Sequence, residues 1–63
     1  MNQIKAIRER NGMSQEDLAK LMGVTQGAVW QWENGLTFPK TGLLVKLADV
    51  LNVKVDELLR EHK

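Results

Sequence analysis

Glycine and asparagine interrupt this sequence at short intervals, and the segments between them carry apolar residues three and four positions apart. This spacing places apolar side chains on one face of an α-helix, whereas a half-buried strand would alternate them. The interruptions, which are typical of helix ends, are Asn11-Gly12, Gly23, Asn34-Gly35 and Asn52. The chain is therefore expected to fold as several short helices that pack their apolar faces together.

The pattern predicts five helical segments. The first covers about residues 2–11, the second follows an N-cap at Ser14 and ends near Met22, and the third follows an N-cap at Thr25. The fourth covers about residues 41–51, and a short last helix around Val55, Leu58 and Leu59 frays by Lys63. Residues 53–55 alternate and could instead start a strand, but the acidic and leucine residues that follow favour a helix.

With 63 residues the chain has room for one domain, which we assign to residues 1–63. No apolar run is long enough for a membrane span or a signal peptide, so no membrane partner is expected. The absence of cysteine excludes disulfides, thiolate nucleophiles and Cys-based zinc sites. His62 is the one histidine and cannot form a triad or a metal cluster alone. We therefore predict a protein that is not an enzyme, with no catalytic residue, metal, cofactor or small-molecule ligand.

Residues 15–34 meet the requirements of two helices that cross near a right angle through a short turn. Ala19 is small enough for close approach of the helices, and Gly23 permits the sharp corner. The apolar residues available to lock the pair together are Leu18, Met22, Val24, Val29 and Trp32. This combination predicts a helix-turn-helix over about residues 15–34.

The segment MSQEDLAKLMGVTQGAV, followed by WENG, resembles the Cro/repressor-like (lambda-repressor-like, xenobiotic-response-element type) helix-turn-helix family of bacterial and phage regulators. The resemblance covers nearly the whole chain, from IKAIRERNG to FPKTGLLVKLADVLNVKVDELL. It implies an all-α, compact five-helix bundle that binds double-stranded DNA as a homodimer on a two-fold symmetric operator. The leading interpretation is a sequence-specific transcriptional regulator, a repressor. It is expected to be encoded by a bacterium or a phage and to act on the nucleoid in the cytoplasm.

In this motif the second helix lies in the major groove with its N-terminal residues toward the base edges. Turning Val29 and Trp32 inward leaves Gln26, Trp30 and Gln31 on the outward side. A glutamine amide can pair with adenine N6 and N7, so both glutamines are predicted to read bases. Trp30 either contacts a thymine methyl group, a sugar or a phosphate, or folds back over the loop beside Phe38.

The resemblance also assigns residues that hold the helix in place. Gln15 takes the family position that contacts a phosphate beside the first base reader. Further candidates for the DNA backbone are Ser14, Thr25, Asn34 and Lys40. Helix capping is an alternative role for the two hydroxyl residues. Arg8 and Glu33 match a structural pair that is expected to fix the tilt of the recognition helix.

The net charge of +1 is low for a nucleic-acid-binding protein and predicts few phosphate ion pairs. Gly27 also stands where many relatives carry a polar base-contacting residue. Both features favour an alternative in which the fold is a protein-interaction module that has lost DNA binding. Another alternative is an antitoxin or controller protein. That role would use an extension outside the domain, of which almost none is expected here.

Apolar residues near the C-terminus exceed what a core of this size is expected to bury. They are Leu43, Val50, Val53, Val55 and Leu59. We predict that some of them form a two-fold dimer interface from the last two helices, with Val50, Val53, Val55 and Leu59 as its members. Incidental exposure of single apolar residues is the alternative.

Overall fold

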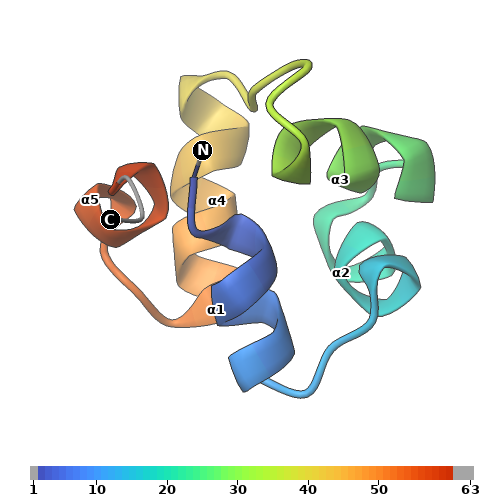
Figure 1. Ribbon diagram of the computed structural model, residues 1–63, viewed down its shortest axis with the longest axis horizontal. Helices are drawn as coiled ribbons and strands as arrows, with labels where there is room; N and C mark the ends of the chain where they lie inside the picture. The colour runs from blue at the N-terminus through green and yellow to red at the C-terminus, as the bar shows by residue number, and fades with distance from the viewer. Residues whose placement is uncertain (1, 61–63) are drawn as a thin grey trace.

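The computed structural model describes residues 2–60. Over these residues the chain forms five helices and no strand: α1 (Ile4–Arg10), α2 (Gln15–Met22), α3 (Gln26–Glu33), α4 (Thr41–Leu51) and α5 (Val55–Leu59). Figure 1 shows α2 and α3 on one side of the molecule and α5 on the other, with α1 and α4 between them. The predicted all-α fold is confirmed, including a helix rather than a strand at residue 55. His62 and the predicted fraying at Lys63 lie outside the described residues.

One apolar cluster joins the five helices of residues 2–60. Every helix contributes at least one fully buried side chain, and these are Ile4, Leu18, Met22, Val29, Leu47, Leu51 and Leu58. Each such burial stabilises the fold by roughly 1.5–3 kcal/mol. The sequence has no cysteine for a disulfide, so packing carries the fold.

The helix ends follow the capping chemistry that the sequence predicted. At the start of α2, the Ser14 hydroxyl accepts from the Asp17 N–H at 3.0 Å, and the Asp17 carboxylate accepts from the Ser14 N–H at 3.0 Å. At the start of α3, the Thr25 hydroxyl accepts from the Ala28 N–H at 3.1 Å. Gly23 and Asn52 end α2 and α4 with φ of 71° and 57°, the left-handed conformation typical of helix C-termini.

The first helix is shorter than predicted, since α1 begins at Ile4 and ends at Arg10 rather than covering residues 2–11. The Asn2 carboxamide oxygen accepts from the Ile4 N–H at 3.0 Å and so lies before the helix. Asn11 closes the other end, because its side chain donates to the Ile7 carbonyl at 2.8 Å. No helix in residues 2–60 has both the length and the apolar composition that crossing a bilayer requires.

Candidate nucleic-acid interface

Helices α2 and α3 form the predicted helix-turn-helix, joined by residues 23–25. Ala19 is 4% exposed, so its small side chain lies in the contact between the helices. The turn is fixed by the Val24 N–H, which donates to the Ala19 carbonyl at 3.0 Å, and by the left-handed Gly23. Val29 and Trp32 anchor α3 in the core, as the sequence predicted. The buried side of α3 therefore packs against the rest of the domain.

The opposite side of α3 faces solvent. We call the exposed positions Gln26, Gly27, Trp30 and Gln31 the outward face. Trp30 is 48% exposed and does not belong to the apolar core cluster. Phe38, beside which the indole could have been buried, is itself 40% exposed. The three predicted base readers thus share one solvent-facing surface.

Arg8 of α1 and Glu33 of α3 form a buried ion pair, with the two side chains 8% and 2% exposed. The contact has two hydrogen bonds: Arg8 Nε donates to Glu33 Oε2 at 2.6 Å, and Nη2 donates to Oε1 at 3.2 Å. Arg8 Nη1 also donates to the Met13 carbonyl at 2.7 Å. The hydrogen bond to Glu33 raises the pKa of Arg8 above its usual value, although burial opposes this shift. The pair ties α3 to α1 at the position where the resemblance placed it.

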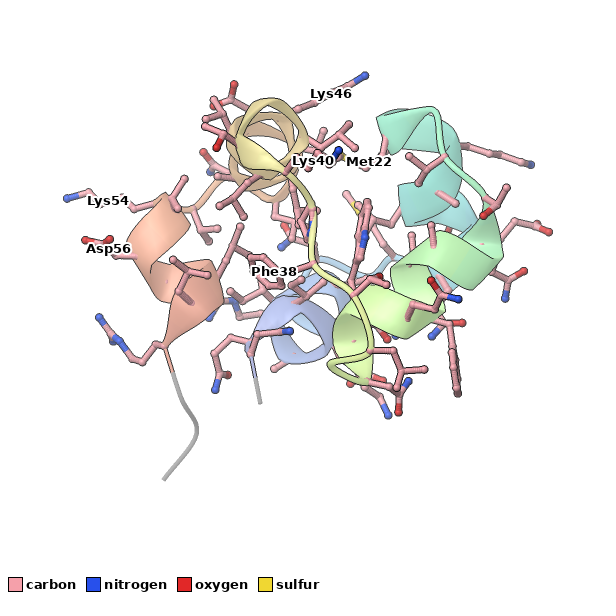
Figure 2. All side chains as sticks on the ribbon, turned by 90° about the horizontal axis from the view of Figure 1, so that it is seen from above. Met22, Phe38, Lys40, Lys46, Lys54 and Asp56 are labelled. Atoms are coloured by element: carbon pink, nitrogen blue, oxygen red, sulfur yellow. The ribbon has the colours of Figure 1, made fainter. Side chains whose placement is uncertain are left out.

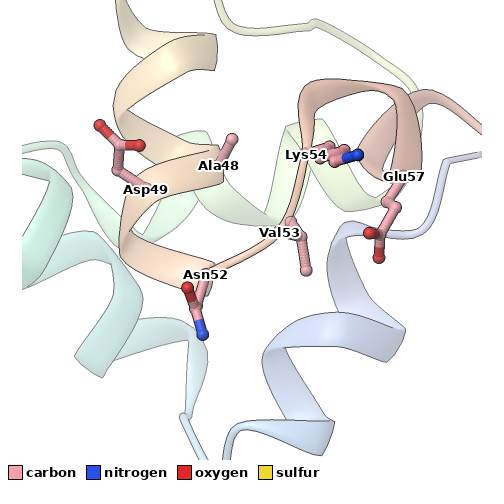
Figure 3. Close-up of a pocket in the computed structure, with 6 residues that line it drawn as sticks. All are labelled: Ala48, Asp49, Asn52, Val53, Lys54 and Glu57. Carbon is pink, nitrogen blue, oxygen red and sulfur yellow. The ribbon is translucent and has the colours of Figure 1, made fainter.

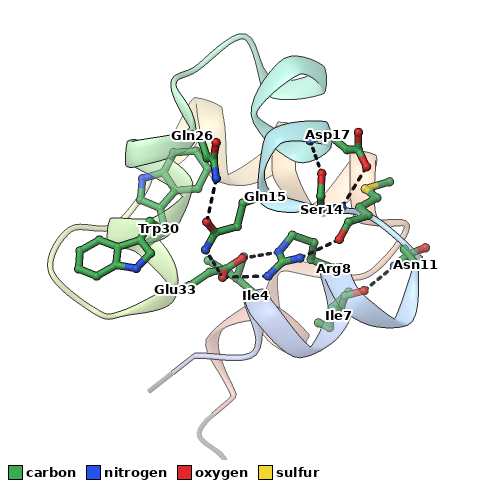
Figure 4. Close-up of polar contacts among 12 residues, drawn as sticks. Ile4, Ile7, Arg8, Asn11, Ser14, Gln15, Asp17, Gln26, Trp30 and Glu33 are labelled. Atoms are coloured by element: carbon green, nitrogen blue, oxygen red, sulfur yellow. Dashed lines mark hydrogen bonds and ion pairs between the residues drawn. The ribbon is translucent and has the colours of Figure 1, made fainter.

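A chain of hydrogen bonds runs from this ion pair to the outward face (Figure 4). Gln15 Nε2 donates to Glu33 Oε1 at 3.0 Å. That bond fixes which end of the Gln15 amide faces outward, because only the oxygen can accept a further bond. Gln26 Nε2 donates to this oxygen at 3.4 Å. Gln15 therefore orients the side chain of the first predicted base reader.

The remaining candidates for backbone contacts are exposed and lie around α3. Ser14 and Thr25 cap α2 and α3, so their alternative role is present in the structure. Asn34 Nδ2 donates to the Trp30 carbonyl at 2.9 Å. Lys40 directly precedes α4 and makes no side-chain cap.

Two side chains and one main-chain carbonyl that the sequence analysis did not single out also support α3. Asn2 Nδ2 donates to the Trp32 carbonyl at 2.8 Å, the Met13 carbonyl binds Arg8, and the Thr37 hydroxyl donates to Gln31 Oε1 at 3.5 Å. Their partners are far apart in the chain or lie across a loop. No local sequence pattern marks such contacts.

The predicted dimer residues divide into two groups. Val50, Val53 and Val55 are half-buried and pack against the core of their own chain. Leu59 is 48% exposed. The four predicted interface residues thus expose less apolar surface than the sequence suggested, and Leu59 of α5 is their exposed member.

Charged side chains are dispersed over the surface. Figure 2 shows Lys46 directed outward from α4, and Lys54 and Asp56 directed away from α3 on the far side of the molecule. On α2, Lys20 lies 4.0 Å from Glu16 in an exposed pair. Amides and an indole, rather than cations, therefore dominate the outward face.

A shallow hollow lies between α4 and α5, lined by Ala48, Asp49, Asn52, Val53, Lys54 and Glu57 (Figure 3). None of these residues belongs to α2 or α3. The charged groups here have mixed sign, so the hollow does not favour one class of ligand.

Comparison with known proteins finds similarity over nearly the whole chain. The sequence pattern of the helix-turn-helix family matches residues 4–58. The uncharacterized HTH-type transcriptional regulator YazB of Bacillus subtilis is 35% identical over 60 residues, which are 95% of this chain and 87% of YazB. An uncharacterized HTH-type transcriptional regulator of Archaeoglobus fulgidus is 36% identical over 55 residues, or 87% of this chain and 79% of that protein. Another, from Methanocaldococcus jannaschii, is 33% identical over 57 residues, which are 90% of this chain and 86% of that protein.

Proposed function

This chain belongs to the helix-turn-helix family, and on that premise we propose that it binds double-stranded DNA sequence-specifically and represses transcription. It acts without catalysis, in the cytoplasm, where the nucleoid is accessible. The observation that carries this proposal is the outward face, on which two glutamine amides and an indole lie on a helix anchored from behind by a buried ion pair.

Helix α3 enters the major groove with its N-terminus first. Gln26 accepts from adenine N6 through Oε1 and donates to N7 through Nε2, which has a second N–H for Gln15. Gln31 reads a base further along the groove in the same way. Each good bidentate pair contributes about 1–3 kcal/mol of discrimination.

Contacts with the DNA backbone fix the register of α3. Gln15 has one Nε2–H left after its bond to Glu33, and this N–H donates a hydrogen bond to a phosphate. Asn34 and Lys40 contribute an amide and an ammonium group, and the capped helix starts at Ser14 and Thr25 present N–H groups to phosphates. With few cations involved, the affinity falls only gently with salt concentration.

Two copies bind one operator. The domain measures 28 Å along its longest axis, less than the roughly 34 Å between successive major grooves on one side of DNA. Two copies side by side are therefore small enough to occupy successive major grooves if they associate through their C-terminal helices. Leu59, with Val50, Val53 and Val55 behind it, supplies the apolar contact.

In vitro selection of duplexes from a random library tests this function. We expect an enriched two-fold symmetric site with A·T pairs in each half-site and a centre-to-centre spacing of about 10 base pairs. A library that shows no enrichment even at low salt would contradict DNA reading. Enrichment of a single, asymmetric half-site would contradict the dimer.

The exposed apolar residues favour a second candidate, a module that binds another protein. Leu36 is 64% exposed and lies in the loop after α3, near Phe38 in sequence. If selection fails, a protein partner that copurifies in stoichiometric amount would support this candidate. A partner that copurifies with a chain that also binds DNA would instead support an antitoxin or controller role.

A further inference from the structure

Two residues of the outward face, Gly27 and Trp30, are not explained by folding. Trp30 leaves about half of a large apolar side chain in water, and none of the core depends on it. A half-exposed tryptophan on a face otherwise made of amides indicates a contact that the isolated chain does not make.

Gly27 is equally unexplained by the fold. It lies in the first turn of α3 and its φ is not in the positive range that favours glycine. A Cβ placed there would meet only the Thr25 hydroxyl oxygen, at an ordinary 3.8 Å. A larger residue would therefore fit and would favour the helix. The consequence of glycine is an open place in the middle of the outward face.

The helix brings these two features together. Trp30 comes three residues after Gly27 and four after Gln26, so it lies one helical turn further along and neighbours both on the same face. Side chains on a helix lean toward its N-terminus. An indole at position 30 is therefore within reach of the place that Gly27 leaves open, beside the amide that Gln15 orients.

The major groove offers one apolar group on the base edges, the 5-methyl group of thymine. Its size matches a place left by a missing side chain, and an indole can cover it. Binding a phosphate would use only the indole N–H and would not require Gly27 to be open. We propose that Gly27 and Trp30 form a thymine-methyl site that adds a T-specific contact next to the base read by Gln26.

This inference rests on the proposed function, because it concerns the same face of α3. The test uses the selected duplex with each thymine in turn replaced by uracil in one half-site, which removes a single methyl group. Fluorescence anisotropy measures the affinity. At one position per half-site, we expect uracil to weaken binding about fourfold, the effect of one buried methyl group.

Variants locate the effect. Trp30→Ala should bind the thymine and uracil duplexes equally, and Gly27→Leu should lose the same preference because its side chain fills the open place. Leu21→Ala removes an equally exposed apolar side chain from α2 and should keep the preference. Circular dichroism checks that each variant remains helical.

A second substitution restores the methyl group without thymine. With cytosine at the sensitive position, 5-methylcytosine should bind about fourfold more tightly than cytosine. Uracil substitutions that have no effect on a duplex bound through Gln26 would overturn this inference and leave the proposed function standing. An effect that persists in Trp30→Ala would overturn it as well. Failure to bind any duplex would overturn both.

Discussion

At the residue scale, the position of the recognition helix depends on one buried charge pair. Arg8 and Glu33 are removed from water, and this cost is offset only because their hydrogen bonds are complete. Gln15 adds a third bond to the same carboxylate. The pair itself could be predicted from the family resemblance. The bonds to Gln15 and Gln26 could not, because they depend on how α2 and α3 meet in space.

Replacing Glu33 by glutamine leaves the Arg8 guanidinium buried without its counter-charge. We expect Glu33→Gln to lower the free energy of unfolding by about 3–5 kcal/mol, measured by urea denaturation. Glu16→Gln makes the same chemical change in the exposed pair with Lys20 and should cost less than about 1 kcal/mol.

If Glu33→Gln does not fold, the double variant Arg8→Met with Glu33→Leu removes both charges and should recover most of the stability. A Glu33→Gln protein as stable as the wild type would show that the charge of the pair is not needed to hold α3.

At the element scale, the helix ends were predictable wherever a residue type performs a local task. Ser14 and Thr25 start α2 and α3, and Gly23 and Asn52 end α2 and α4, because capping and left-handed geometry act over a few residues. For α1 the sequence predicts ends that lie too far out, since two apolar residues mark a face but not a boundary. There the ends depend on the side chains of Asn2 and Asn11.

The capping box of α2 makes the stability of the fold depend on pH. Hydrogen bonds from the Ser14 N–H and, to a smaller extent, from the Ser14 hydroxyl lower the pKa of the Asp17 carboxyl. A carboxyl with a lowered folded-state pKa stabilises the fold fully above its unfolded pKa of about 3.9, and this stabilisation is lost as the pH falls through the folded-state pKa.

We therefore expect Asp17→Asn to melt at a lower temperature than the wild type at about pH 6, and the two melting temperatures to converge toward about pH 2. Thermal denaturation followed by circular dichroism measures both. A difference in melting temperature that is the same at both pH values would mean that the charge of Asp17 plays no part in the cap.

Two glycines of the same motif should respond in opposite ways to alanine. Gly27 has helical geometry and room for a methyl group, so Gly27→Ala should raise the free energy of unfolding by about 0.5–1 kcal/mol. Gly23 has a φ of 71°, and alanine in this conformation should cost about 1–2 kcal/mol. Chemical denaturation of both variants tests this, and a loss of stability in Gly27→Ala would reveal a folding role that its surroundings do not show.

At the scale of the whole molecule, the five short helices within residues 2–60 pack around one core, and we propose the outward face of α3 and the exposed side of α5 as surfaces for partners. The resemblance to Cro/repressor-like proteins is confirmed by the family match over residues 4–58, and the predicted fold is confirmed with it. The half-burial of Val50, Val53 and Val55 could not be predicted, because it depends on how α4 and α5 pack against the core. The dimer interface stays a prediction that rests mainly on Leu59.

Leu59→Lys places a charge on this surface while leaving the core intact. If α5 forms the two-fold contact, the variant should sediment as a monomer at micromolar concentration where the wild type is a dimer, with stability changed by less than about 0.5 kcal/mol. Val45→Lys alters an equally exposed residue on α4 and should leave the dimer unchanged. A wild-type monomer, or dimers of both variants, would exclude the α5 interface.

The central claim is that the outward face of α3 reads DNA bases, and one measurement of specificity tests it most directly. The affinities of wild type and Gln26→Ala are compared on the selected duplex and on duplexes altered at single A·T pairs. When the adenine that Gln26 reads is replaced, the affinity of the wild type should fall about 5- to 150-fold. Gln26→Ala should bind the selected and the altered duplex equally and still discriminate at other positions. If Gln26→Ala discriminated between the duplexes as strongly as the wild type at every position, this would contradict base reading by the outward face of α3.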